Sequence, residues 1–153
     1  LLQNPRASFT VRREQLPGQR YPGLGMLRDV VAWLVLACER LGFDGIAFVP
    51  GQYYMAALGT RVLRFVRPEA QAQFEAMRAA LDGLELGEAN KAVNQGRVVD
   101  AKTADPITWI PETMVLPVSE KLRRRLQSED YRAAVHRARS QLAFIVVGES
   151  QRR

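Results

Sequence analysis

The stretch Arg20-Tyr21-Pro22-Gly23-Leu24-Gly25 leads directly into an amphipathic segment that ends near residue 41, and the predicted fold is organised around this pair. Its two glycines let the backbone turn tightly and leave its amide hydrogens uncovered. A loop of this kind at a helix N-terminus binds anions, because unpaired amides and the helix dipole favour negative charge there. The stretch therefore predicts a site for an anion such as a pyrophosphate, with an ordinary Pro-Gly turn as the alternative.

Hydropathy patterning around this loop predicts a strand, the loop, a helix and a second strand, in that order. Residues 7–13 alternate apolar and polar side chains, which is typical of a short strand. Apolar residues recur at helical spacing over residues 24–41, and Gly42 ends the helix. Residues 44–50 form a near-continuous apolar run, which predicts a central strand covered on both faces. Together these elements form a βαβ unit.

The spacing Arg20-x-x-Gly23-x-Gly25 resembles the Arg/Gln-x-x-Gly-x-Gly/Ala loop of the GCN5-related N-acetyltransferase (GNAT) superfamily, and the resemblance covers about residues 6–66. In that family the loop joins a strand to a helix and wraps the pyrophosphate of acetyl-CoA. The resemblance implies an α/β fold with a GNAT-like mixed sheet flanked by helices, and acetyl-CoA or another acyl-CoA as cosubstrate. The cofactor-binding residues that it implies are Val11, Arg12, Arg20, Gly23, Leu24, Gly25 and Arg28.

The same resemblance points to the candidate catalytic residues in the segment that follows the apolar strand. GNAT enzymes commonly carry a tyrosine there, which protonates the departing CoA thiolate, followed by a Gly-Phe pair. In this chain Phe65 matches the Phe, whereas Arg64 and Thr60 occupy the Gly and tyrosine positions. A Thr hydroxyl is a much poorer general acid than a phenol. The candidate acids are therefore Tyr53 and Tyr54, at the start of a helix expected over residues 53–66, with water or a loss of catalysis as alternatives.

Length and composition indicate a single domain over residues 1–153, because 47% hydrophobic and 25% charged residues are ordinary for a globular protein. Residues 6–66 would form its acyl-CoA-binding half, and residues 84–153 an extension of helices and strands that the resemblance does not assign. The lone Cys38 falls on the apolar face of the first helix, which predicts a buried thiol in a cytoplasmic protein. No apolar run approaches the ~20 residues needed to cross a bilayer.

The net charge of +6 gathers near the glycine loop, since residues 1–28 hold five arginines and one acid. Arginine is suited to bidentate phosphate contacts, which the phosphates of CoA would use. A nucleic-acid patch is the alternative, and it ranks second because only Phe9 and Tyr21 interleave with the arginines as stacking platforms. One cysteine and one histidine with scattered carboxylates predict no metal site.

Beyond residue 66 the sequence predicts short helices and strands. Helices are expected over residues 68–81, 87–94 and 129–140, together with a basic helix that Ser119 caps at its N-terminus. Strands are expected over residues 97–100 and 107–110, joined as a hairpin, and over residues 142–147. His136, the only histidine, is predicted to be a surface or helix-capping residue.

The function that the resemblance implies is acyl-CoA-dependent transfer of an acyl group to an unidentified amine, which attacks the thioester carbonyl directly. The alternatives are a non-catalytic GNAT-like module that binds acyl-CoA or a protein partner, and a nucleic-acid-binding domain. A GNAT-like sheet also needs strands beyond residues 7–13, and residues 1–6 are too few to form them. We therefore expect self-association or a missing N-terminal portion, unless residues 142–147 cover that edge.

Overall fold

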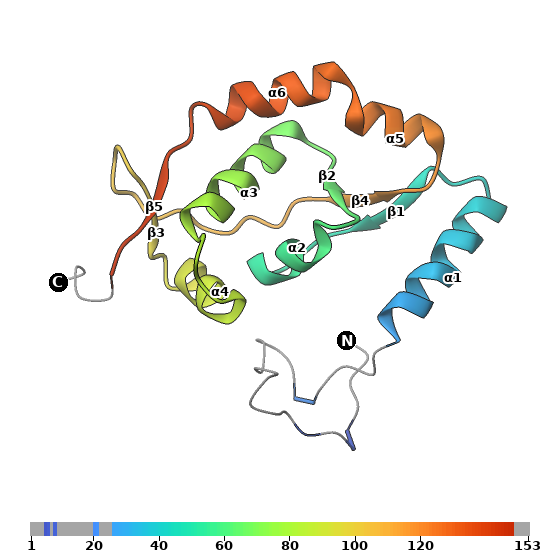
Figure 1. Ribbon diagram of the computed structural model, residues 1–153, viewed down its shortest axis with the longest axis horizontal. Helices are drawn as coiled ribbons and strands as arrows, with labels where there is room; N and C mark the ends of the chain where they lie inside the picture. Colours follow the sequence, from blue (N-terminus) through green and yellow to red (C-terminus); the bar gives the residue numbers. More distant parts are fainter. Residues whose placement is uncertain (1–4, 7, 9–19, 22–25, 149–153) are drawn as a thin grey trace.

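The structure is a computed structural model that describes residues 5, 6, 8, 20, 21 and 26–148. These residues form a mixed α/β arrangement of six helices and two small antiparallel sheets (Figure 1). The helices are α1 (Leu27–Arg40), α2 (Tyr53–Gly59), α3 (Pro68–Ala80), α4 (Leu86–Asn94), α5 (Glu120–Gln127) and α6 (Glu129–Arg139). The strands are β1 (Gly45–Phe48), β2 (Arg64–Phe65), β3 (Val98–Asp100), β4 (Met114–Pro117) and β5 (Phe144–Val146).

The helices predicted beyond residue 66 are confirmed as α3, α4, α5 and α6; α3, α4 and α6 lie within one residue of their expected bounds, and α5 begins directly after Ser119 as expected. A serine side chain caps the N-terminus of α5 and another caps that of α6. The Oγ of Ser119 accepts from the backbone N–H of Leu122, and the Oγ of Ser128 accepts from that of Tyr131, both at 3.1 Å. Each bond satisfies one of the amides that a helix N-terminus leaves unpaired.

The larger sheet has the order β1-β4-β2, and β4 is antiparallel to both neighbours, with Ile46 opposite Leu116 and Phe65 opposite Met114. Within the described residues β1 pairs with β4 alone and is an edge strand, so its central position stays a prediction. The strand expected over residues 7–13, which would complete the βαβ unit, lies largely outside the described residues. All described strand pairs are antiparallel.

The helix expected over residues 53–66 is too long, because α2 ends at Gly59 and the chain turns into β2. The backbone N–H of Leu63 donates to the carbonyl of Gly59 at 2.9 Å, which closes the turn. A Cβ on Gly59 would lie 2.8 Å from Cδ1 of Leu63, so the absence of a side chain permits this close approach. Thr60 therefore lies just after the helix and not within it.

The smaller sheet corrects the expected hairpin. Strand β3 forms as predicted, but its partner is β5, with Val99 opposite Ile145, and residues 107–110 form no strand. The segment after β3 forms one isolated antiparallel bridge with it, between Val99 and Pro106. It then leaves the sheet, and the indole N–H of Trp109 donates to the carbonyl of Pro50 at 3.0 Å. Packing of Trp109 against the core takes precedence over local pairing.

The core is an aromatic cluster between α2, α3 and β2. The ring of Phe74 lies 5.6 Å from that of Phe65 and 5.8 Å from that of Tyr53, and the Tyr53 ring lies 5.9 Å from that of Trp109. Aromatic pairs at these separations contribute about 0.5–1.5 kcal/mol each beyond the burial of their surface. Helix α6 lies across α3 on the outside of this cluster (Figure 1).

Helix α1 stands apart from this core and lies against β1 (Figure 1). The prediction that Cys38 is buried is confirmed, and its thiol donates to the carbonyl of Phe43 at 3.4 Å. Of the other described residues of the expected apolar face, Val30, Val31 and Val35 are half-buried, whereas Leu27, Leu34 and Leu41 are exposed. None of the described helices combines the length and the apolar character needed to cross a membrane.

Asn90 fixes the start of α2 from the neighbouring helix α4. It is 0% exposed, its Oδ1 accepts from the backbone N–H of Tyr54 at 3.1 Å, and its Nδ2 donates to Oε1 of Gln52 at 3.3 Å. Gln52, at the N-cap position of α2, provides no side-chain cap of its own. A tertiary contact therefore replaces the local capping bond.

We predict that Asn90→Ala lowers the free energy of unfolding by about 1–3 kcal/mol, because it leaves the buried amide of Tyr54 without an acceptor. Asn94→Ala is the matched control, since Asn94 is exposed on the same helix and also donates to Gln52, at 3.0 Å. We expect the control to change stability by less than about 0.5 kcal/mol. Urea denaturation measures both, and equal effects of the two substitutions would contradict the capping role.

Candidate functional sites

The glycine loop is described only at its borders. Gly23, Leu24 and Gly25 lie outside the described residues, as do the predicted cofactor-binding residues Val11 and Arg12. The remaining two, Arg20 and Arg28, are exposed. Helix α1 begins at Leu27, directly after the loop, and Met26 at the N-cap position makes no side-chain capping bond. The first amides of α1 therefore receive no acceptor from the capping residue.

The two candidate acids lie in the core. Tyr53 is 3% and Tyr54 is 4% exposed, and both belong to the first turn of α2. Burial raises the pKa of Tyr53 above its usual value, against a smaller lowering by Arg78, so its hydroxyl stays protonated near neutral pH. Thr60, at the expected tyrosine position, donates its hydroxyl hydrogen to the carbonyl of Ala57 at 2.9 Å.

Described residues of α3, α5, α6 and β2 line a groove with a volume of about 730 Å³. We call it the α3–α6 groove. This volume falls within the ~300–1,000 Å³ that is typical of small-molecule sites. Among its lining residues are the charged and phenolic side chains Arg64, Glu75, Tyr131, Arg132, His136 and Arg139. Neither the candidate tyrosines of α2 nor the described arginines beside the glycine loop line it.

Helix α6 supplies half of the groove because its lining residues share one face. Residues 131, 132, 135, 136 and 139 follow helical spacing, so they form a single stripe turned toward α3. Tyr131 anchors this stripe, since its hydroxyl donates to the carbonyl oxygen of Phe65 in β2 at 2.6 Å. The lining of the groove is therefore tied to the core that holds β2 in place.

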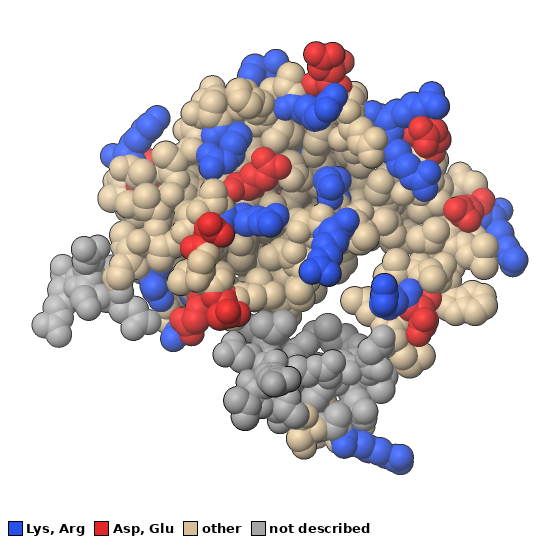
Figure 2. Space-filling view, viewed as in Figure 1, with Lys and Arg blue, Asp and Glu red and all other residues tan. Residues whose placement is uncertain are grey.

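The electrostatics of the groove are predominantly positive. Arg64 donates through Nη1 to the carbonyls of Thr60 and Leu63, and Arg139 donates through Nη1 to the carbonyl of Leu142. Within the part of the chain that the structure describes, Arg132 and His136 have no carboxylate at ion-pair distance. Figure 2 shows Lys and Arg side chains spread over α3, α5 and α6 with fewer acids among them.

Tyr131 is held in its protonated form by its surroundings. Burial, followed by the carboxylate of Glu75, raises the pKa of Tyr131 to about 12, while Arg64 opposes the shift. The phenol therefore keeps its bond to Phe65 at any ordinary pH. Glu75 is itself oriented, because its Oε1 accepts from Nε2 of Gln71 at 2.8 Å.

The glycine loop stays a prediction, because its glycines lie outside the described residues, whereas the α3–α6 groove was not predicted. His136 is exposed, as predicted, but its neighbours across the groove come from β2 and α3, far away in the sequence. The available signal was the spacing of Arg132, His136 and Arg139, which places three basic or titratable side chains on one helical face. The basic run of α5, in contrast, is paired locally, with Arg123 and Arg124 both near Glu120.

Comparison of this chain with protein-family models, curated proteins and solved structures finds no match. Among the described residues, no group of three or more His, Cys, Asp or Glu side chains is arranged so that it could hold a metal ion.

We predict that the stabilising contribution of Tyr131 is lost at high pH. Its pKa of about 12 in the folded chain exceeds the usual 10, so the contribution is complete below about pH 10 and falls as the pH rises through 12. Chemical denaturation across this range should show wild-type stability falling toward that of Tyr131→Phe. Parallel pH profiles for the two proteins would contradict this assignment.

Proposed function

We propose that this chain is a GNAT-like acyl-CoA-dependent N-acyltransferase whose glycine loop binds the pyrophosphate of the cosubstrate. The observation that carries the proposal is the placement of α1, which begins two residues after Gly25 and returns the chain to β1. Met26 supplies no capping side chain, so this residue offers no acceptor that would compete with an anion for the first amides of α1. The first turn also carries Arg28, which would add positive charge beside them, next to the carboxylate of Asp29.

The edge of β1 supports the same proposal. Among the described residues this strand uses one edge to pair with β4 and leaves the other without a partner. The resemblance expects the strand over residues 7–13, which carries Val11 and Arg12, on that open side. Backbone amides of that strand would position the thioester and polarise its carbonyl for attack by the amine. Acetyl-CoA or another acyl-CoA is the proposed cosubstrate, and the acceptor class stays open.

The positions of the candidate proton donors suggest a second candidate function. A general acid must reach the departing thiolate, yet both Tyr53 and Tyr54 are buried and the hydroxyl of Thr60 is bonded within its own turn. This burial favours a non-catalytic module that binds acyl-CoA without transferring the acyl group. Under the enzyme proposal, Tyr53, Tyr54 or water supplies the proton.

We predict that Gly25→Asp weakens CoA binding at least about tenfold, because it adds a side chain and a negative charge at the N-terminus of α1. Gly148→Asp is the matched control, since a Cβ at Gly148 meets nothing within 4 Å and the glycine lies just after β5. Titration calorimetry with CoA measures both variants. Equal affinities in folded Gly25→Asp and Gly148→Asp proteins would remove the loop from the site.

Thermal stabilisation separates the proposed functions from a nucleic-acid-binding one. A ligand at 100 times its dissociation constant stabilises the fold by about 2.7 kcal/mol, which shifts the melting temperature visibly. We expect the shift with CoA and none with short duplex DNA or RNA at physiological salt. Acyl transfer to a panel of amines then distinguishes the enzyme from the binding module.

A further inference from the structure

The α3–α6 groove has a charge imbalance that its own contacts do not neutralise. Three arginines line it against one glutamate, which leaves an excess of two positive charges with His136 counted as neutral. The acid, Glu75, already accepts from Gln71. Like charges gathered in one concave surface raise its potential and attract an oppositely charged ligand.

The basic side chains in the groove differ in how many of their N–H groups already donate to an acceptor. Arg64 and Arg139 each commit Nη1 to backbone carbonyls, which fixes the guanidinium and leaves its other N–H groups for a ligand. Arg132 and His136 have no carboxylate at ion-pair distance among the described residues. Two preoriented guanidiniums and two uncommitted side chains therefore line the same groove.

The groove also offers an apolar wall. Leu126 at the end of α5 is buried and Val135 of α6 is half-buried, and both line it beside the ring of Tyr131. Residues 132 and 139 are seven apart on α6, so their positions span about 10 Å along the helix. This length fits a small organic molecule with a charged end better than it fits a bare ion.

We propose that the α3–α6 groove binds a small phosphate monoester whose organic part packs against Leu126, Val135 and Tyr131. A phosphomonoester carries a charge of about −1.5 to −2 near neutral pH, which matches the excess of two positive charges. A carboxylate carries one negative charge and would leave half of that excess uncompensated. Guanidinium groups also match the geometry of phosphate oxygens and bind them through paired hydrogen bonds.

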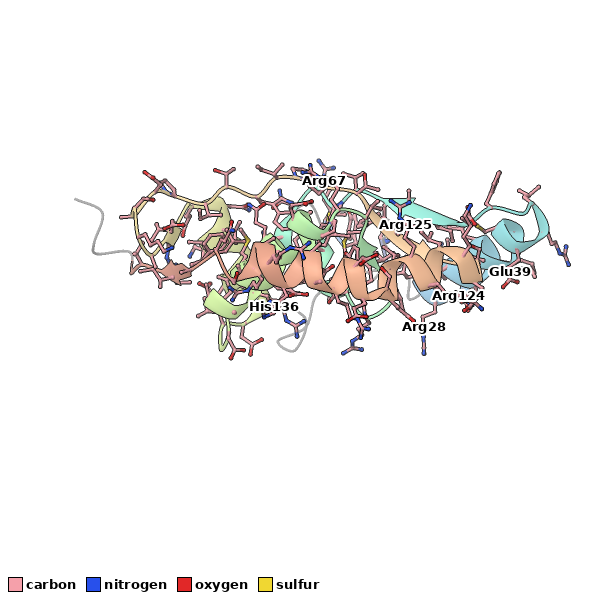
Figure 3. All side chains as sticks on the ribbon, turned by 90° about the horizontal axis from the view of Figure 1, so that it is seen from above. Arg28, Glu39, Arg67, Arg124, Arg125 and His136 are labelled. Carbon is pink, nitrogen blue, oxygen red and sulfur yellow. The ribbon has the colours of Figure 1, made fainter. Side chains whose placement is uncertain are left out.

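This site is separate from the proposed CoA-binding loop. Helix α1 lies beside β1, whereas Arg64 belongs to β2, and these strands form opposite edges of the sheet. His136 on α6 and Arg28 on α1 are labelled in Figure 3, and Figure 1 shows the two helices on different sides of the molecule. The inference therefore does not depend on the acyltransferase proposal.

His136 provides a reporter for the test because it is the only histidine in the chain. We would titrate the full chain with phenyl phosphate at low ionic strength and follow the imidazole resonances of His136 by NMR. Benzoate is the singly charged control ligand of similar shape. We expect a saturable shift of these resonances with phenyl phosphate and at least about tenfold weaker binding of benzoate.

Arg132→Gln tests the assigned contact, and Arg137→Gln is the matched control because Arg137 is exposed on the same helix and does not line the groove. Arg132 is exposed as well, so neither substitution disturbs the core. We expect Arg132→Gln to weaken phenyl phosphate binding about tenfold and Arg137→Gln to leave it unchanged.

Three results of the ligand titrations would overturn the proposal, and a fourth comes from the Gly25→Asp protein. The three are the lack of a saturable His136 shift, equal affinity for phenyl phosphate and benzoate, and equal affinity of the Arg132→Gln and Arg137→Gln proteins. Gly25→Asp gives the remaining comparison, since it should leave the His136 response intact. Loss of that response in Gly25→Asp would place the phosphate at the glycine loop and remove it from the groove.

Discussion

Phe65 joins parts of the structure that lie far apart in the sequence. Its backbone pairs with Met114 in β4, its ring lies 5.6 Å from that of Phe74 in α3, and its carbonyl accepts from Tyr131 in α6. Complete burial of a Phe side chain stabilises the folded state by about 1.5–3 kcal/mol, which is a large contribution from a strand of only two residues. Elements β4, α3 and α6 thus converge on β2, and this strand holds Tyr131, which lines the α3–α6 groove.

The predictability of this fold depends on how local each element is. Helices α3 to α6 carry their own periodicity and, for α5 and α6, a serine cap within the same stretch, so the sequence was sufficient to predict them. Strand β4 has only four residues and no local partner, and its pairing with β1 and β2 depends on segments distant in sequence. The early end of α2 and the departure of Trp109 from β3 likewise follow from tertiary packing.

The two sites illustrate the same difference. A glycine loop before a helix is contiguous, so its spacing can be recognised in the sequence without any knowledge of the fold. The α3–α6 groove combines Arg64 of β2, Glu75 of α3 and Arg132 of α6, which no sequence spacing relates. From α6 alone, the stripe containing Arg132, His136 and Arg139 predicts a basic face, and only the packing of α3 against α6 makes that face one wall of a groove.

Strand β1 and helix α1 each leave part of their structure without a packing or hydrogen-bonding partner among the described residues. A strand edge leaves N–H and C=O groups without partners, and an amphipathic helix gains most of its stability by burying its apolar stripe. In the described residues β1 pairs along one edge only, and Leu27, Leu34 and Leu41 of the neighbouring helix α1 are exposed. A strand paired with β1 would satisfy the backbone groups of its open edge and would extend the surface against which α1 packs. The βαβ order predicted from the sequence expects such a strand over residues 7–13, and this pairing stays a prediction because most of those residues lie outside the described part of the chain.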